Sequence, residues 1–83
     1  MRLLSVEKTT YEVDGCKEPC WVVSNGYTIV RIAPFYHLIG RNTIVLTEFL
    51  DGDFNSQEEW DMDFDSIDKS SAIKIANRFS VYL

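Results

Sequence analysis

The sequence predicts an α+β domain: an antiparallel sheet of four or five strands with one C-terminal helix packed on one face. Three observations carry this prediction. Short apolar or alternating runs, separated by turns that contain glycine, fill most of residues 3–65. Residues 66–83 instead place apolar side chains three and four positions apart. The length of 83 residues suits one domain, residues 1–83, with one modest core.

The first strand is predicted over residues 3–13. Its apolar side chains change faces near residues 8–9, which indicates a bulge or twist there. The pair Asp14-Gly15 predicts a turn, and residues 16–20 predict the loop that follows.

The next element is predicted to be a hairpin around Asn25-Gly26, flanked by strands over residues 20–24 and 27–32. A two-residue type I′ turn needs positive φ at both positions, which Asn and Gly tolerate best. This register pairs Ser24 with Tyr27, Val22 with Ile29 and Trp21 with Val30.

Another strand is predicted over residues 43–50, with Ile44 and Leu46 on one face. Residues 51–53 then predict a turn, and residues 54–57 a loop. The final helix is predicted to begin at a cap formed by Asp65 or Ser66. Its apolar stripe comprises Ala72, Ile75, Ala76, Phe79, Tyr82 and Leu83.

Residues 58–65 alternate strictly between acidic and apolar side chains. In a strand, Trp60, Met62 and Phe64 would face the core, and the acids would form a row on the other face. Carboxylates in that row would lie about 6.6 Å apart, twice the rise per residue. Like charges in a row repel and Asp is a poor strand former, so the row indicates a function.

Acidic residues are concentrated in the second half of the chain. The whole chain has a net charge of −5, but residues 47–83 carry nine acids and three bases. All nine acids lie between Glu48 and Asp68, with no Lys or Arg among them. Such a surface repels nucleic acid and anionic membranes and attracts basic proteins. The expected partner is therefore a protein with a basic surface, with no direct nucleic acid and no membrane.

The predicted function is a non-enzymatic binding protein that blocks the basic, nucleic-acid-binding cleft of a nuclease or guide complex. The carboxylate spacing is of the same order as that of phosphates along a nucleic-acid strand, so the row would act as a nucleic-acid mimic. Another interpretation is a solvated strand that discourages edge-to-edge aggregation. The predicted partner-binding residues are Asp51, Asp53, Glu58, Glu59, Asp61, Asp63 and Asp65.

In length, acidity and compactness, the whole chain resembles the small acidic proteins that bacteriophages use against host restriction or CRISPR systems. The resemblance includes no shared motif. It implies a defence nuclease or its guide complex as partner, blocked sterically or electrostatically. The alternative function is a homodimeric or accessory protein–protein interaction module, in which the acids only keep the protein in solution. Self-association would then use the sheet, the apolar residues 35–39 and the helix.

Two parts of the sequence resemble metal-binding motifs, one for calcium and one for zinc. Asp61-x-Asp63-x-Asp65 resembles the start of an EF-hand loop, but its positions 6 and 12 hold Ser66 and Ala72 instead of Gly and Glu. A frame that starts at Asp51 fails at the same two positions. Cys16, Cys20 and His37 offer three soft ligands, whereas a closed zinc site needs four. We expect two reduced thiols, no metal and no cofactor, with a redox pair or a metal shared between two chains as the alternatives.

No motif for catalysis is present in the sequence. His37 has no nucleophile or carboxylate in its company, and the four glycines are isolated turn residues. The N-terminal residues are too short and too soon charged for a signal peptide, and no apolar run approaches the ~20 residues of a membrane span. The sequence therefore predicts a cytoplasmic protein that is not an enzyme.

Overall fold

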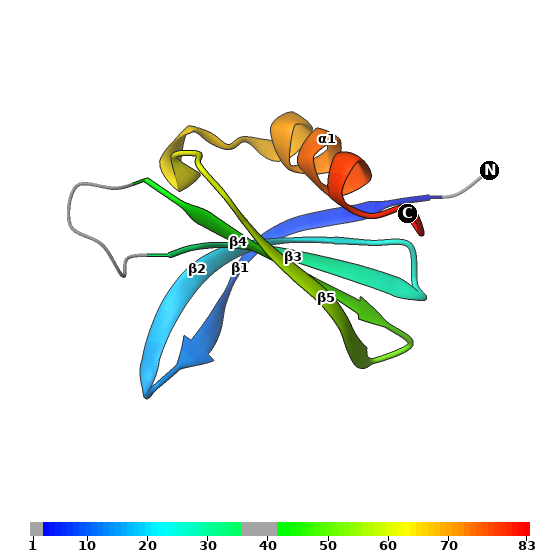
Figure 1. Cartoon of the computed structure of the whole chain (residues 1–83), viewed down its shortest axis with the longest axis horizontal. Helices are drawn as coiled ribbons and strands as arrows, with labels where there is room; N and C mark the ends of the chain where they lie inside the picture. The colour runs from blue at the N-terminus through cyan, green and yellow to red at the C-terminus, as the bar shows by residue number, and fades with distance from the viewer. Residues whose placement is uncertain (1–2, 36–41) are drawn as a thin grey trace.

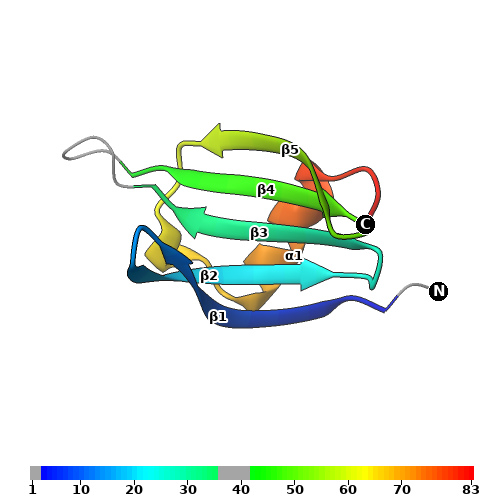
Figure 2. The same cartoon turned by 90° about the horizontal axis from the view of Figure 1, so that it is seen from below.

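The structure is a computed structural model that describes residues 3–35 and 42–83. One antiparallel sheet has its strands in the order β1-β2-β3-β4-β5, and the helix α1 packs against one face of it (Figures 1 and 2). This arrangement confirms the predicted α+β class. The elements are β1 (Ser5–Val13), β2 (Cys16–Ser24), β3 (Thr28–Pro34), β4 (Ile44–Leu50), β5 (Asp53–Trp60), the 3₁₀ helix η1 (Phe64–Ser66) and α1 (Lys69–Phe79).

Two of the hairpins close through Asp-Gly pairs. Asp14 and Gly15 have φ angles of 50° and 82°, and Asp51 and Gly52 have 50° and 86°. Positive φ at both central residues is the requirement of a type I′ turn, whose twist matches that of the strands. The first of these turns leads directly into β2, so the loop predicted for residues 16–20 is wrong: these residues are paired with β1.

The hairpin at Asn25-Gly26 forms, but its predicted register is wrong. Ser24 pairs with Ile29, two residues further along than predicted. The Asn25 side chain explains the longer loop, because its Oδ1 accepts hydrogen bonds from the backbone N–H groups of Tyr27 at 3.0 Å and Thr28 at 2.8 Å. A shift of two residues leaves every side chain on its predicted face, so the core is unaffected.

The strand irregularity lies in β5 rather than in β1. The register of β1 with β2 is continuous from Ser5 to Val13, so the predicted bulge is absent. The apolar side chains of β1 lie on both faces of the sheet without any break in the pairing. The register of β4 with β5 shifts between Glu48 and Phe49. Residues 54–57 belong to β5, so the predicted loop there is also wrong.

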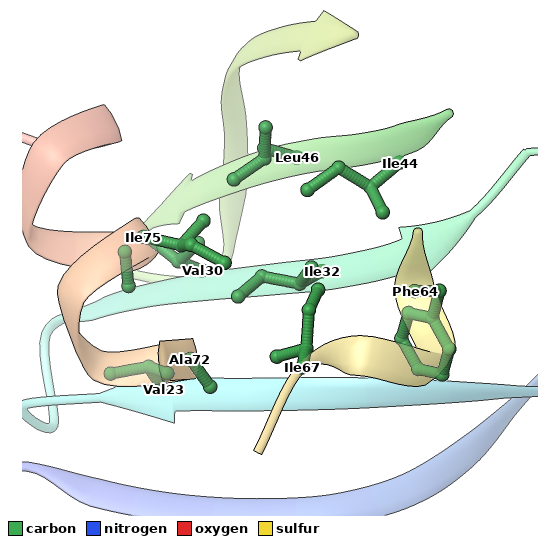
Figure 3. Close-up of a cluster of buried hydrophobic side chains, with 10 residues drawn as sticks. Val23, Val30, Ile32, Ile44, Leu46, Phe64, Ile67, Ala72 and Ile75 are labelled. Carbon is green, nitrogen blue, oxygen red and sulfur yellow. The ribbon is translucent and has the colours of Figure 1, made fainter. Parts of the chain in front are cut away.

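The core lies between the sheet and α1 (Figure 3). Side chains from β2, β3 and β4 meet η1, the segment after it and the apolar stripe of the helix. The Trp60 ring meets the Phe79 ring edge-on at 6.4 Å between centroids, which joins the end of β5 to the end of α1. The buried cluster comprises Val23, Val30, Ile32, Ile44, Leu46, Phe64, Ile67, Ala72, Ile75 and Ala76.

The helix begins later than predicted. Asp68 is its N-cap and accepts a hydrogen bond from the Ser71 N–H at 2.8 Å, whereas the predicted cap Asp65 lies within η1. The apolar stripe is confirmed through Ala72, Ile75 and Ala76, but α1 ends at Phe79, before Tyr82. The predictions for His37 and for most of the apolar residues 35–39 concern positions outside the described residues.

Candidate functional site

The acidic residues 58–65 do not form the predicted strand. β5 ends at Trp60, residues 61–63 are irregular, and Phe64 to Ser66 form η1. Asp63 caps η1 by accepting a hydrogen bond from the Asp65 N–H at 3.2 Å. A side chain that bonds to a nearby backbone N–H competes with strand pairing, which explains why the chain turns here.

The alternating pattern nevertheless identified which side chains face inward. Phe64 is buried, and Trp60 and Met62 pack against the core. The intervening acids Glu59, Asp61, Asp63 and Asp65 are all exposed. An evenly spaced row of carboxylates is therefore replaced by a cluster at a bend of the chain, and the predicted match to phosphate spacing is wrong.

The structure divides the predicted site residues into two groups. Asp51 and Asp53 lie at the β4–β5 turn, and the others lie at the opposite end of β5. The nearest members of the two groups, Asp53 and Glu58, lie five positions apart on β5, or about 16 Å, so the two groups do not form one patch. We call the second group the acidic segment: Glu58, Glu59, Asp61, Asp63 and Asp65.

Part of the acidic composition has a local structural cause. Asp51 occupies a left-handed turn position that Asp and Asn tolerate better than most residues. Asp63 and Asp68 cap helices, and the Ser71 backbone N–H that donates to Asp68 holds the pKa of this carboxyl below its usual value. The acid count alone therefore overstates the number of carboxylates that remain for a partner.

Glu48 is a polar residue whose role the sequence did not reveal. Its side chain is 3% exposed. Its carboxylate accepts hydrogen bonds from Asn55 Nδ2 at 2.7 Å, Ser56 Oγ at 3.3 Å and the Ser80 hydroxyl. It thus ties the bulge of β5 to the residue that follows α1. Only the β4–β5 register shift brings Asn55 and Ser56 to one carboxylate, and no local signal indicates that shift.

Four of the five carboxylates of the acidic segment form no salt bridge with a described residue. These four are Glu58, Glu59, Asp63 and Asp65. Glu58 accepts a hydrogen bond from Trp60 Nε1 at 2.9 Å, which orients this carboxylate. Glu58 and Asp63 are therefore positioned by hydrogen bonds from uncharged donors.

The two cysteines do not share a ligand site. They lie four residues apart on β2, about 13 Å by the strand rise, so they can neither bridge nor bind one ion together. Cys16 is exposed and Cys20 is fully buried, and burial raises the pKa of the Cys20 thiol. In the described part of the chain, no three His, Cys, Asp or Glu side chains are grouped to hold a metal ion.

A group of exposed apolar side chains lies at the end of the molecule that carries Asp51. The Asp51 N–H donates to the Tyr27 carbonyl at 2.8 Å, and Asn25 Nδ2 donates to the Tyr82 carbonyl at 3.0 Å. These bonds bring the β4–β5 turn, the β2–β3 loop and the C-terminal residues together, as Figure 2 also shows. Exposed apolar side chains at this end are Tyr27, Phe54, Val81 and Tyr82.

None of the described helices is long and apolar enough to cross a bilayer. No protein-family model, curated protein or solved structure matches the chain. Its function is therefore inferred from the side chains and their placement.

Proposed function

We propose that this protein is a non-enzymatic binding protein whose acidic segment occupies a basic, nucleic-acid-binding cleft of a partner protein. The proposed partner is a nuclease or its guide complex, because such proteins have the basic clefts that a negatively charged segment would bind. The observation that carries the proposal is the group of five carboxylates within residues 58–65, with no Lys or Arg among them. Surfaces that serve only solubility normally mix both signs of charge.

The acidic segment is held by the fold, which favours binding. Trp60 packs on Phe79, Phe64 is buried, and Asp63 caps η1. Carboxylates on a fixed backbone lose less conformational entropy on binding than those on a disordered tail. Because the cluster follows a bend instead of a straight strand, we propose that it competes with nucleic acid by charge and bulk, without copying a regular phosphate backbone.

This mechanism is dominated by long-range electrostatics. A negative cluster and a basic cleft attract each other before contact, which raises the association rate at low ionic strength. Added salt shortens the Debye length from about 10 Å at 0.1 M to about 3 Å at 1 M. Binding through the acidic segment is therefore expected to weaken strongly over that range.

The test is affinity capture from bacterial lysate at low and high salt, followed by identification of the retained proteins. Wild type is compared with the double variant Asp61→Asn and Asp65→Asn, which spares the cap residue Asp63. The matched control is Asp51→Asn with Asp53→Asn, which removes two charges at the far end of β5. We expect a nucleic-acid enzyme that wild type and control retain and that the first variant and high salt release. Equal capture by both variants would contradict the proposal.

A second candidate function is a homodimeric or accessory interaction module. The exposed side chains of Tyr27, Phe54, Val81 and Tyr82 at one end of the molecule favour it, because aromatic residues are enriched in protein interfaces. An interface formed by these side chains would be apolar, so its affinity would depend little on salt concentration. Sedimentation at 0.1 M and 1 M salt distinguishes the candidates: a dimer that persists at 1 M and dissociates on Phe54→Ser supports the module.

A further inference from the structure

No described helix or strand covers the face of the sheet opposite α1 (Figure 1). In Figure 1, the tips of the β1–β2 and β4–β5 hairpins bend away from the helix and border this open face on two sides. The strand register places Arg31, Val45 and Glu59 on it, because each lies one position from a pair that contains a core residue. Tyr11 lies on the same face, since the Arg31 guanidinium contacts its ring.

The open face already holds one cation. The Arg31 guanidinium lies 4.3 Å from the centroid of the Tyr11 ring and 5.4 Å from that of Phe49. Both distances are within the range of an attractive cation–π contact. The aromatic side chains of this face therefore provide an environment in which a guanidinium is stable.

Beside this contact, the open face has a hollow of about 390 Å³. Its walls combine aromatic, aliphatic and acidic side chains drawn from all five strands and the residue after β3. The chief members are Tyr11, Val13, Glu18, Phe35, Val45 and Glu59. Burial is the main cause of the raised pKa of the Tyr11 phenol; the Arg31 guanidinium opposes it and the Glu18 carboxylate adds to it, so both charged groups lie close to the ring.

We propose that this hollow binds the arginine or lysine side chains of an extended basic segment in a partner protein. The inference rests on the proposed function only in taking the partner to be basic. The aliphatic stem of Arg or Lys suits Val13 and Val45, while its charged end suits a carboxylate at the rim.

The spacing of the two carboxylates indicates an extended segment. Glu18 lies on β2 and Glu59 on β5, three strand spacings apart, or about 14 Å. One cation does not reach both carboxylates. Two basic side chains four residues apart on an extended chain are separated by about 13 Å and match them.

Charge decides between this occupant and the alternatives. A second copy of the chain has a net charge of −5 and would bring acidic rims together. Nucleic acid would bring phosphates to Glu18 and Glu59. Only a basic segment places opposite charges at both rims, so a basic peptide is the occupant that the hollow fits.

The test uses the synthetic peptide acetyl-Arg-Ala-Ala-Ala-Arg-amide, titrated into ¹⁵N-labelled protein and followed by chemical-shift changes. We expect the largest changes at Tyr11, Val45 and Gln57, which line the hollow. Glu18→Gln should weaken binding about twofold to fivefold, as for a partly exposed ion pair. Glu18→Lys, which places a cation at the rim, should abolish it. Glu12→Gln, on the opposite face of the same hairpin, should have no effect.

Two outcomes separate this inference from the proposed function. The hollow is not the site if Glu18→Gln and Glu12→Gln reduce the affinity for the peptide equally, or if the chemical-shift changes are confined to residues 61–65. The acidic segment would then remain a candidate binding surface. If Asp61→Asn with Asp65→Asn releases no lysate protein but the peptide still perturbs the hollow, the hollow stands and the proposed function fails. Melting temperatures of all variants verify that each is folded.

Discussion

At the scale of single residues, Glu48 is the most consequential polar side chain. A buried carboxylate is destabilising unless donors surround it, and here Asn55, Ser56 and Ser80 donate to it. These donors come from β5 and from the end of α1, so the network joins two elements far apart in the sequence. It fixes the β5 bulge as a structural feature, and the acidic segment follows from the end of that same strand.

We predict that Glu48→Ala lowers the free energy of unfolding by about 2–3 kcal/mol, because it leaves the buried Ser80 hydroxyl and the half-buried Ser56 hydroxyl without their acceptor. Urea denaturation followed by tryptophan fluorescence measures the loss. Glu58→Ala is the control, since an exposed carboxylate at the end of β5 should change stability by no more than about 0.5 kcal/mol. Equal losses for the two variants would show that the buried network does not stabilise the fold.

Asp68 provides a prediction on pH. Its folded-state pKa lies below the ordinary value of 3.8, chiefly because the Ser71 backbone N–H donates to it. A carboxyl with a lowered folded pKa contributes stability above its unfolded pKa and loses it as pH falls through the folded value. Asn accepts the same capping bond but does not titrate.

The difference in melting temperature between wild type and Asp68→Asn should therefore be constant between pH 5 and pH 7. As pH drops below 3.8, the melting temperature of wild type should fall relative to that of Asp68→Asn. Melting curves at pH 7, 5 and 3 measure this. If the difference in melting temperature stays constant down to pH 3, the charge of Asp68 does not contribute to stability, and the side chain acts only by accepting the capping hydrogen bond.

At the scale of elements, the hairpins show what local sequence can predict. Among the described residues, the Asp14-Gly15 and Asp51-Gly52 pairs correctly predicted two turns, because positive φ is a local requirement. Asn25-Gly26 also lies at a turn, but only Gly26 has positive φ there, so a two-residue type I′ turn does not form. The register at Asn25 was not predictable from the dipeptide, since its side-chain oxygen captures two backbone N–H groups and lengthens the loop. The strand predicted for residues 58–65 was wrong for a similar reason. A period of two fits a strand, but an irregular segment followed by η1, which Asp63 caps, places the same side chains inward and outward.

Gly52 tests the type I′ turn that leads into β5. Its φ of 86° is unfavourable for any residue with a Cβ, and no atom lies within 4 Å of the Cβ position. Gly52→Ala should therefore cost about 1–2 kcal/mol through backbone strain alone, with no steric clash. Gly52→Asn should recover part of this loss, because Asn tolerates left-handed φ. Thermal unfolding ranks the three proteins, and equal stability for Ala and Asn would contradict the role of φ.

At the scale of the whole molecule, the two binding surfaces differ in how far the sequence predicts them. The alternation of residues 58–65 predicts exposed acids, and the structure confirms this. Their separation from Asp51 and Asp53 was not predictable, because it depends on residues 54–57 joining β5. The hollow on the open face was not predictable either. Tyr11 and Glu59 are 48 positions apart in the sequence and line one hollow only after all five strands pair.

The last prediction concerns the balance between charge and fold. Asp61→Asn with Asp65→Asn keeps the size and the hydrogen-bonding oxygen of each side chain while it removes two like charges. The free energy of unfolding should stay within about 0.5 kcal/mol of wild type or rise slightly, since mutual repulsion within the acidic segment is relieved. Any gain should vanish at 1 M salt, where charges a few ångströms apart are already screened.

Urea denaturation at low and high salt measures this balance, with Asp63→Ala as the contrasting variant that removes the cap of η1. That variant should lose about 0.5–2 kcal/mol at both salt concentrations, because the hydrogen bond to the Asp65 N–H is short-range. If the double Asn variant loses as much, these carboxylates stabilise the bend itself. If it does not, they are dispensable for folding, and release of a captured partner by the same variant reports directly on the binding surface.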